Sequence, residues 1–248
     1  MRTETKMGKP TMMFSANRLI IGCSRYKKGC TYTTIKPISN IIVPLPLINK
    51  ESQNFDDAFI NAVDALERDD YETAYKLFLP LAEQGNVDGQ RNLGVLYYLG
   101  QGVPQDYKEA EKWWELAAEQ GDVDAQYNLG LMHLGELGGM QDREEAEEWM
   151  RLSAEQGNAE AQVTLGLMHL GESGETEDCL GETENHKEAV KWFRLSAEQK
   201  NADAQCWLGH MYLEGMGVTE DYAEAIKWWK IAAEQGHERA KYNLENYA

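Results

Sequence analysis

Residues 118–130 read AEQGDVDAQYNLG, and this stretch decides the fold because its words return along the chain at a regular interval. The tetrapeptide AEQG, with the variant AEQK in the fourth copy, begins at Ala82, Ala118, Ala154, Ala197 and Ala233. The steps between these copies are 36, 36, 43 and 36 residues. The dipeptide LG keeps the same interval, beginning at Leu93, Leu129, Leu165 and Leu208. Self-similarity at a period of roughly 20–50 residues predicts a solenoid, in which each unit buries its apolar face against its neighbours.

Each unit is predicted to be a pair of helices, such as Val87–Tyr98 followed by Tyr107–Gln120. A short polar residue precedes each second helix and is expected to cap its free N–H groups: Asp70, Asp106, Asp142, Asn185 and Asp221. A glycine then closes the second helix in most units, where a left-handed residue ends the last turn. Caps for the next first helix follow at Asn86, Asp122, Asn158 and Asn201. Lys200 replaces the closing glycine in one unit, so we expect that helix end to be strained or differently shaped.

A glycine recurs inside every first helix, at Gly94, Gly130, Gly166 and Gly209. Glycine costs about 1 kcal/mol relative to alanine in a helix, so its repeated use predicts a close approach of the partner helix. The expected small residues on that partner are Ala110, Ala146, Ala189 and Ala225. Large residues between units are expected at Trp113/Trp114, Trp149/Met150, Trp192/Phe193 and Trp228/Trp229.

The chain divides into a basic extension, residues 1–53, and an acidic repeat array, residues 54–248. Residues 1–50 hold nine Lys and Arg and one acid, a charge of +8, which leaves −26 for residues 51–248 of a total of −18. The extension shows no sustained period and contains Pro37, Pro44 and Pro46, so we expect a flexible or loosely docked segment. The array is predicted to contain units at about 54–85, 86–121, 122–157, 158–200 and 201–236, and a terminal capping helix at 237–248.

The charge and the apolar pattern restrict the partners. An array this acidic repels nucleic acid and favours basic or apolar partners, although the acids could equally serve only solubility. The sequence contains no run of about 18 apolar residues, so no membrane span is expected. Ile20-Ile21-Gly22-Cys23 resembles a lipoprotein cleavage box, but Arg18 interrupts the apolar stretch before it. Lipid anchoring at Cys23 and translation from an upstream start codon therefore both stay open. The cysteines at 23, 30, 179 and 206 have no regular spacing, so we expect no metal and no cofactor.

These words together, A-E-Q-G-N-x-x-A-Q-x-x-L-G-x-x-Y followed by G-x-G-V-x-x-D-Y-x-E-A-x-x-W-W, resemble the Sel1-like repeat family, a relative of the tetratricopeptide repeat. Gly100–Val103 and Gly215–Val218 match its loop well, and the resemblance covers residues 55–248. It implies an all-α, right-handed α/α superhelical solenoid that acts as a protein-interaction scaffold or adaptor, in signalling, secretion or host–microbe contact. A bacterial cytoplasmic or periplasmic protein is expected. The acidic insertion Gly171–Asn185 departs from the pattern, and we interpret it as a solvated loop.

Alignment of Leu93-Gly94 on the tetratricopeptide pattern predicts which residues face the inner, concave surface. The predicted partner-binding residues are Asp88, Arg91, Asn92, Tyr98, Asp124, Tyr127, Asn128, Glu160, Thr164, Asp203, Trp207 and His210. Together they describe an apolar strip with aromatic ends and a border of acids, which suits an extended or helical peptide with apolar and some basic side chains. Asn92 and Asn128 are expected to hold the peptide backbone. The alternative for Leu131, Leu167 and Trp207 is that they belong to the core.

The sequence leaves open other functions besides peptide binding. The +8 extension could itself dock on the acidic array. Some cysteine-rich relatives with these repeats have been described as β-lactamases, and a structural assembly subunit would use the same surfaces. His133 and His169 occupy a tyrosine position of the repeat, and Ser153 and Ser196 an alanine position, so we interpret all four as packing residues. His186 is expected in the insertion loop. No catalytic residue is therefore predicted, and a hydrolase is the less favoured alternative.

Overall fold

The computed structural model describes residues 56–135, 137, 142–172 and 184–247, and every regular element in these ranges is an α-helix. The helices are α1 (Asp56–Glu67), α2 (Tyr71–Glu83), α3 (Val87–Leu99), α4 (Tyr107–Glu119), α5 (Val123–His133), α6 (Arg143–Glu155), α7 (Ala159–Glu172), α8 (Glu184–Glu198), α9 (Ala202–Glu214), α10 (Tyr222–Glu234) and α11 (Glu238–Tyr247). The predicted extension, residues 1–53, and most of the insertion loop lie outside the described residues. No described helix is both long and apolar enough to cross a membrane.

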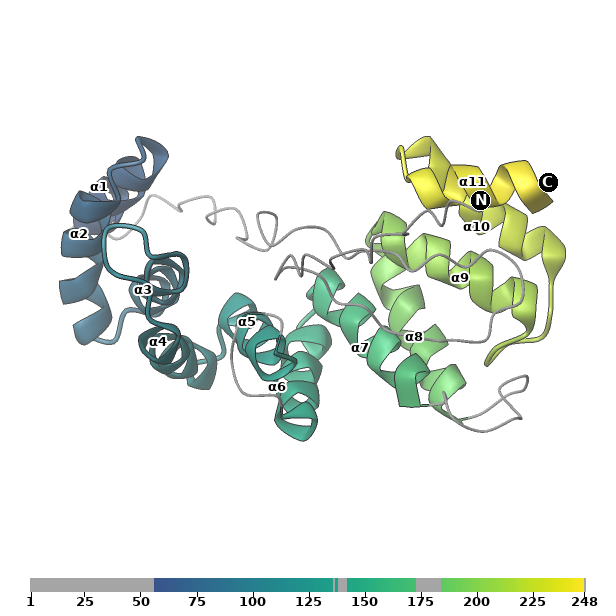
Figure 1. The fold of residues 1–248 in the computed structure, drawn as a ribbon, viewed down its shortest axis with the longest axis horizontal. Coiled ribbons are helices and arrows are strands. Elements are labelled where there is room, and N and C mark those ends of the chain that lie inside the picture. The colour runs from purple at the N-terminus through teal and green to yellow at the C-terminus, as the bar shows by residue number, and fades with distance from the viewer. Residues whose placement is uncertain (1–55, 136, 138–141, 173–183, 248) are drawn as a thin grey trace, which may run out of the picture.

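The helices form a curved row of hairpins. Each helix packs mainly on the helices directly before and after it in the chain. Figure 1 shows the row bending from α1 to α11 so that both ends lie on the same side, with α3 and α5 on the inner side of α4 and α6. The prediction of an all-α solenoid is confirmed. The predicted binding residues lie on the first helix of four of these pairs, α3, α5, α7 and α9.

The predicted caps are confirmed at most helix starts. Asp106 accepts hydrogen bonds from the backbone N–H groups of Lys108 and Glu109, at 3.0 and 3.2 Å. The first helices are capped in the same way, as where Asn86 Oδ1 accepts from Gly89 N at 2.7 Å. The prediction for Asn185 was wrong, because α8 begins one residue earlier, at Glu184.

Lys200 keeps the backbone shape that glycine has in the other units. Its φ is +67°, and its N–H donates to the carbonyl of Ala197 at 3.0 Å, as the N–H of Gly157 donates to Ala154. The helix end is therefore not differently shaped, and of the two expected outcomes the structure shows the strained one. The left-handed conformation is unfavourable for a residue with a Cβ, so the backbone is strained at this turn.

Replacing Lys200 by glycine is expected to raise the free energy of unfolding by about 1 kcal/mol, because the left-handed conformation costs an L-residue about 1 kcal/mol. Urea denaturation followed by circular dichroism measures the change. Gly157→Ala is the matched control: φ is +98° there and a Cβ would meet nothing within 4 Å, so steric crowding plays no part and the variant should lose stability. A Lys200→Gly protein no more stable than the parent would contradict the strain.

The glycines inside the first helices make room for one large side chain of the following helix. A Cβ at Gly94 would lie 2.3 Å from Trp114 Nε1, and one at Gly209 would lie 2.4 Å from Trp229 Nε1. Met150 and Phe193 fill the same space at Gly130 and Gly166. The expectation that alanines such as Ala110 face these glycines was wrong. The indole of Trp114 enters instead, and its Nε1 donates to the carbonyl of Arg91 at 3.2 Å.

A chain of buried glutamines joins the units. It explains why the AEQ tripeptide and the glutamine of each first helix recur. Each one donates from Nε2 to the alanine carbonyl of the preceding AEQ word and accepts at Oε1 from the glutamine of the following word. For Gln126 the partners are Ala118 O at 3.2 Å and Gln156 Nε2 at 2.7 Å. The other members are Gln90, Gln162 and Gln205. A buried amide costs stability unless it is paired, so this arrangement favours one register of stacking.

The last helix, α11, departs from the repeat at two positions: that of the buried glutamine and that of the glycine that admits a large side chain of the following helix. Lys241 stands where the buried glutamines stand in the other first helices, and Glu245 stands where their glycine stands. Tyr247 instead contacts the ring of Trp229, with centroids 5.7 Å apart. α11 therefore covers the end of the core without offering a place for another second helix.

Candidate protein-binding face

The predicted binding residues all lie on the first helices α3, α5, α7 and α9, at equivalent positions of the repeat. In Figure 1, α3 and α5 lie on the inner side of the curve relative to α4 and α6. The structure divides the residues into three kinds: those that join neighbouring units, those that are buried, and those that stay partly exposed beside the hollow.

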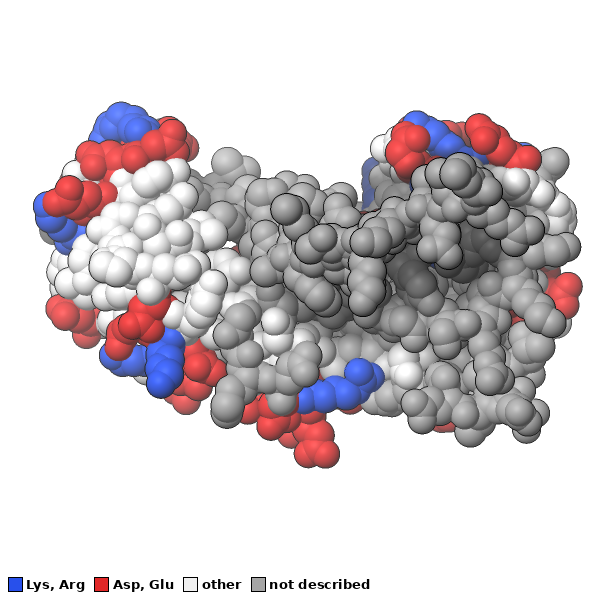
Figure 2. All heavy atoms as spheres, viewed as in Figure 1, with Lys and Arg blue, Asp and Glu red and all other residues white. Residues whose placement is uncertain are grey.

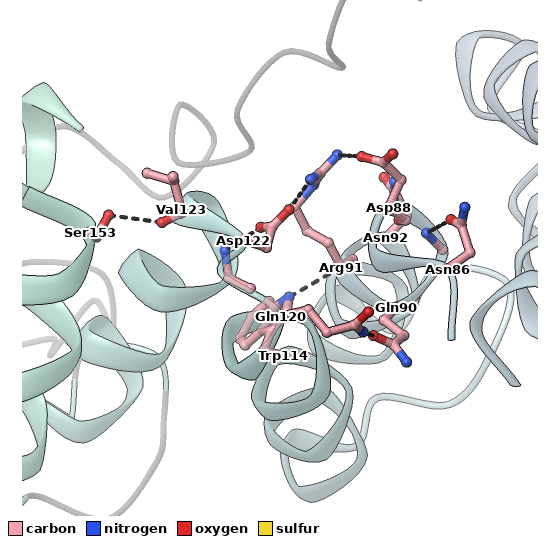
Figure 3. Close-up of polar contacts among 12 residues, drawn as sticks. Asn86, Asp88, Gln90, Arg91, Asn92, Trp114, Gln120, Asp122, Val123 and Ser153 are labelled. Carbon is pink, nitrogen blue, oxygen red and sulfur yellow. Dashed lines mark hydrogen bonds and ion pairs between the residues drawn. The ribbon is translucent and has the colours of Figure 1, made fainter. Parts of the chain in front are cut away.

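Arg91 joins the first two full units through two carboxylates (Figure 3). Its Nη2 donates to Asp88 Oδ1 at 2.6 Å within α3, and its Nη1 forms an ion pair with Asp122 Oδ2 at the start of the next unit. Asp122 also caps α5, where its Oδ1 accepts from Ala125 N at 2.8 Å. Burial disfavours the charged guanidinium, but Asp122 and Asp88 outweigh it and raise the pKa of Arg91. The side chain is only 11% exposed, so it serves the junction between units.

Asp124 adds a third carboxylate to this junction. Burial raises its pKa, Arg91 lowers it, and Asp122 and Asp88 raise it further, with a net upward shift. Three carboxylates around one guanidinium leave this part of the inner face negative. A lysine or arginine of a partner would lower the repulsion among them.

Two acids of the predicted border also connect units. Glu160 Oε1 accepts from Asn201 Nδ2 at 3.1 Å, and Asp203 Oδ1 lies 2.9 Å from His237 Nε2. His237 Nδ1 accepts from the N–H of Ala240 at 3.1 Å, so Nε2 carries the proton and donates to Asp203. In each case the acid holds the residue that caps the next first helix. These acids therefore stabilise the stacking of units as well as facing the hollow.

The polar residues predicted to hold a peptide backbone are buried. Asn92, Asn128 and Thr164 are 8%, 5% and 3% exposed. Asn92 Nδ2 donates to the carbonyl of Asp88 at 2.7 Å, inside its own helix. That bond uses one of the two N–H groups of the amide, and burial leaves little of the other within reach of a peptide.

The aromatic residues lie at different depths. Tyr127 is 4% exposed, whereas Tyr98 and Trp207 are partly buried. Tyr98 lies against Tyr107 and Trp114, with ring centroids 5.5 and 5.7 Å from its own. Burial raises the pKa of Tyr98 to about 12, and Tyr107 makes a smaller contribution in the same direction. Leu131 and Leu167 are 1% and 5% exposed and belong to the core, so the core alternative is confirmed for these two leucines.

Trp207 carries a contact that the sequence interpretation missed. Its ring stacks on Phe193 at 5.9 Å and meets the edge of His210 at 6.0 Å. The guanidinium of Arg239 from α11 lies 4.9 Å from the ring centroid, a cation–π contact. Arg239 stands 36 residues after Asp203, so carrying the repeat register into the last helix would have found it. The indole thus already binds a basic side chain of its own chain.

The histidines and serines weighed as catalytic groups are part of the packing. Ser153 and Ser196 are fully buried, and their hydroxyls donate to the carbonyls of Val123 and Ala159 at 2.8 Å. His133 is 8% exposed, with Nε2 3.6 Å from Glu145. His186 lies in α8 and is 2% exposed, so its placement in the loop was wrong. Within the described ranges, no group of three or more His, Cys, Asp or Glu is placed to hold a metal ion.

Comparison with known proteins gives the family. The family model described as Sel1 repeat matches residues 63–86, 87–122, 123–158, 159–201 and 202–237. A Sel1 repeat protein from Oxalobacter formigenes is 32% identical, with a TM-score of 0.68 over 77% of this chain and 73% of that one. A protective antigen from uropathogenic Escherichia coli, c5321, is 30% identical, with a TM-score of 0.46 over 77% of this chain and 48% of that one. Among curated proteins, none matched the chain.

Proposed function

Because this chain belongs to the Sel1 repeat family, whose members generally mediate protein–protein interaction, we propose that it is an adaptor that binds a segment of another protein on its inner face. Proteins of this family are typically non-enzymatic scaffolds. The proposed segment is an extended or helical peptide with apolar and basic side chains.

One observation carries the proposal: a row of large apolar side chains that remain partly exposed on the first helices. The position of Tyr98 recurs as Leu134, Leu170 and Leu213, and all four are only partly buried. Trp207, six residues before Leu213 on α9, adds a partly buried indole in the last full unit. Apolar side chains on a concave surface lose contact with water when a partner covers them, which favours binding.

Charge supports the basic character of the partner. Asp88, Asp122 and Asp124 share the guanidinium of Arg91 at the amino-terminal ends of α3 and α5, and Glu160 and Asp203 lie at the equivalent position of later units. These acids lie about 15 Å along the helix axis from the row that begins with Tyr98, so they border the opposite end of the first helices. Rim charges of this kind increase the rate of association and select the partner more than they increase affinity. The contact of Arg239 with Trp207 supports a basic partner side chain, because an indole on one of the first helices already binds a guanidinium.

The basic extension is also a candidate occupant of the inner face. Its charge of +8 is opposite to the −26 of the rest of the chain. Docking driven by such charges weakens as salt shields them, over a Debye length of about 10 Å at 0.1 M ionic strength. If residues 1–50 compete with a partner, their deletion should raise partner affinity at low salt and have less effect at high salt. Unchanged affinity and unchanged proteolysis would count against this form of regulation.

Replacing Trp207 by alanine, or Leu134 by serine, is expected to weaken peptide binding about tenfold or more, because central apolar anchors dominate such interfaces. Fluorescence anisotropy with a panel of peptides that combine apolar and basic residues measures the affinity. The Asn128→Ala protein tests the amide role in the same assay.

Tyr222→Ala is the control, because Tyr222 is 52% exposed and lies on α10, a second helix. Denaturant unfolding of each variant separates lost binding from lost structure. Wild-type affinity in the Trp207, Leu134 and Asn128 variants together would reject the inner face as the binding site.

A further inference from the structure

Among the second helices of the full units, an excess of acid is confined to α4 and α6. α4 contains two lysines and four glutamates, and α6 contains two arginines and five glutamates. In α8 and α10 the basic and acidic residues are equal in number. In Figure 2, acidic side chains border the lower edge of the molecule, where α4 and α6 lie in Figure 1. The excess therefore belongs to one place in the array rather than to the repeat as such.

One position of the repeat shows what α4 lacks. Glu115 stands where α6, α8 and α10 have a basic residue: Arg151, Arg194 and Lys230. Arg151 forms an ion pair with Glu147, four residues earlier, and Arg194 Nη2 donates to the hydroxyl of Tyr212 at 3.0 Å. These two arginines thus bind acceptors on their own or the next helix. α4 has a carboxylate in place of such a cation.

Glu115 belongs to a group of carboxylates around His133 of α5. His133 Nε2 lies 3.8 Å from Glu111 Oε1 on α4 and 3.6 Å from Glu145 Oε1 on α6. Burial raises the pKa of Glu115, and so do the nearby carboxylates of Glu111, Glu145 and Glu119. His133 acts in the opposite direction. We call Glu111, Glu115, Glu145 and His133 the α4–α6 acidic cluster.

No basic side chain of the described chain neutralises this cluster. None of the described lysines and arginines forms an ion pair with its three glutamates. Lys112 and Arg151 pair with glutamates of their own helices outside the cluster, and Arg143 donates to the carbonyl of Met168 at 2.7 Å. The glutamates nevertheless remain within reach of a partner, because two of their side chains are 33% and 47% exposed.

His133 points into the cluster without a hydrogen bond. Its side chain is 10% exposed, and Nε2 is buried and has no hydrogen-bond partner. The residues at the same position of other units do have partners: Tyr97 lies 3.1 Å from the hydroxyl of Tyr75, and Tyr212 accepts from Arg194. A buried polar atom without a partner costs stability. A donor placed among the carboxylates could bond to Nε2 as well, because a neutral imidazole nitrogen accepts a hydrogen bond.

We propose that the α4–α6 acidic cluster binds an arginine side chain of a partner protein. A guanidinium presents five N–H donors in a planar fork, so one arginine can bond to carboxylates of two helices and to the ring nitrogen between them. In α6 and α8 the chain supplies an arginine of its own at the equivalent position, Arg151 and Arg194. The carboxylates belong to second helices, so this contact goes beyond the proposed binding of a peptide on the inner face.

The experiment titrates the full chain with capped arginine amide and follows the ring nitrogens of His133 by NMR. Capped glutamine amide is the uncharged control probe, and capped lysine amide is the second cation. The arginine probe should shift the Nε2 resonance in a saturable way, and the glutamine probe should leave it unchanged. The lysine probe should bind more weakly, because an ammonium lacks the planar fork. His133→Tyr restores the residue of Tyr97 and Tyr212 and assigns the resonance.

Glu115→Arg tests whether the chain can fill the site itself. The new side chain would stand four residues after Glu111, as Arg151 stands after Glu147. The variant should bind the arginine probe about tenfold or more weakly, because its own guanidinium occupies the carboxylates. Its thermal midpoint should also rise by about 2–4 °C, as for a modest gain in stability in a chain of this size.

Glu111→Gln combined with Glu145→Gln removes the carboxylates without supplying a cation. This protein should bind the arginine probe about tenfold or more weakly and with less dependence on salt. Glu198→Gln is the matched control, because Glu198 is an exposed acid of α8 outside the cluster, and its affinity should stay at the wild-type value. Helical circular dichroism of each variant should match the wild type, which separates lost binding from lost structure.

The Trp207→Ala protein should respond to the arginine probe as the wild type does, so failure of the inner face as a binding site would leave this result intact. Loss of the response in that variant would assign the arginine to the inner face and overturn the proposal. So would an equal response to the glutamine probe, or wild-type affinity in both the Glu115 variant and the double glutamine variant. Saturable binding of zinc chloride at His133 with no response to arginine would also overturn it.

Discussion

Replacing Trp114 by alanine is expected to lower the free energy of unfolding by about 3–5 kcal/mol, as for other large-to-small substitutions in a core. The side chain is 1% exposed and fills the space above Gly94, and its Nε1 donates to the carbonyl of Arg91 at 3.2 Å. Removing it leaves a cavity and takes away this additional hydrogen bond to a carbonyl inside α3. Equilibrium unfolding in urea, followed by circular dichroism, measures the loss.

Gly94→Ala turns this prediction into a test of the packing itself. In the wild type a Cβ at position 94 would lie 2.3 Å from Trp114 Nε1, so the substitution should destabilise the protein by about 1–3 kcal/mol. In the Trp114→Ala background the space is open, and alanine should stabilise α3 by up to about 1 kcal/mol over glycine. The effect of Gly94→Ala should therefore change sign. Equal destabilisation in both backgrounds would show that the glycine serves another purpose.

The stability of the protein is expected to fall as the pH drops from about 6.5 towards 4, in part because of His210. Burial and then the nearby Arg239 lower the pKa of His210 to about 4, from 6.5 in an unfolded chain. A lowered folded-state pKa means that the unfolded chain takes up the proton first. The contribution of His210 is therefore complete above pH 6.5 and is lost as the pH falls through the folded-state value, by up to about 3 kcal/mol.

His210→Leu is the variant that isolates this contribution, because Leu131 and Leu167 occupy the same position in other units. Unfolding free energies of wild type and variant, measured at intervals from pH 7.5 to 4, should converge or cross as the pH falls. Carboxylates titrate in both proteins, so the difference between the curves reports His210. Parallel curves would contradict the buried, neutral histidine.

Much of the local architecture was predictable from the chain. The last helix, α11 (Glu238–Tyr247), lies within the predicted capping helix at 237–248, and the pair Val87–Tyr98 and Tyr107–Gln120 was predicted to within one residue. Caps such as Asp106 were found from sequence because a capping side chain bonds to an N–H only two or three residues away. The prediction for Asn185 was wrong because this residue lies inside α8, which includes Glu184.

The sequence predicted the helices on which the candidate binding residues lie, but not how deeply their side chains are buried. The repeat register placed the predicted residues on α3, α5, α7 and α9, but Asn128, Thr164 and Tyr127 proved to be buried. A helix position that borders the hollow also borders the neighbouring unit, and periodicity cannot tell how far a side chain turns between them. The contact of Arg239 with Trp207 was not foreseen because Arg239 lies on α11, beyond the four units whose inner positions were predicted.

The sequence by itself determined the hairpins, their stacking interval and the acidic character of the array, because periodicity, capping residues and charge act over a few neighbouring positions. Only the tertiary structure decided that Trp114 rather than Ala110 faces Gly94, that Gln126 pairs with Ala118 and Gln156, and that Arg91 spans two units. Several of these contacts join residues about 20 to 31 positions apart in the chain. Their partners depend on how close neighbouring helices come, and that distance is decided by the packing of all their side chains together.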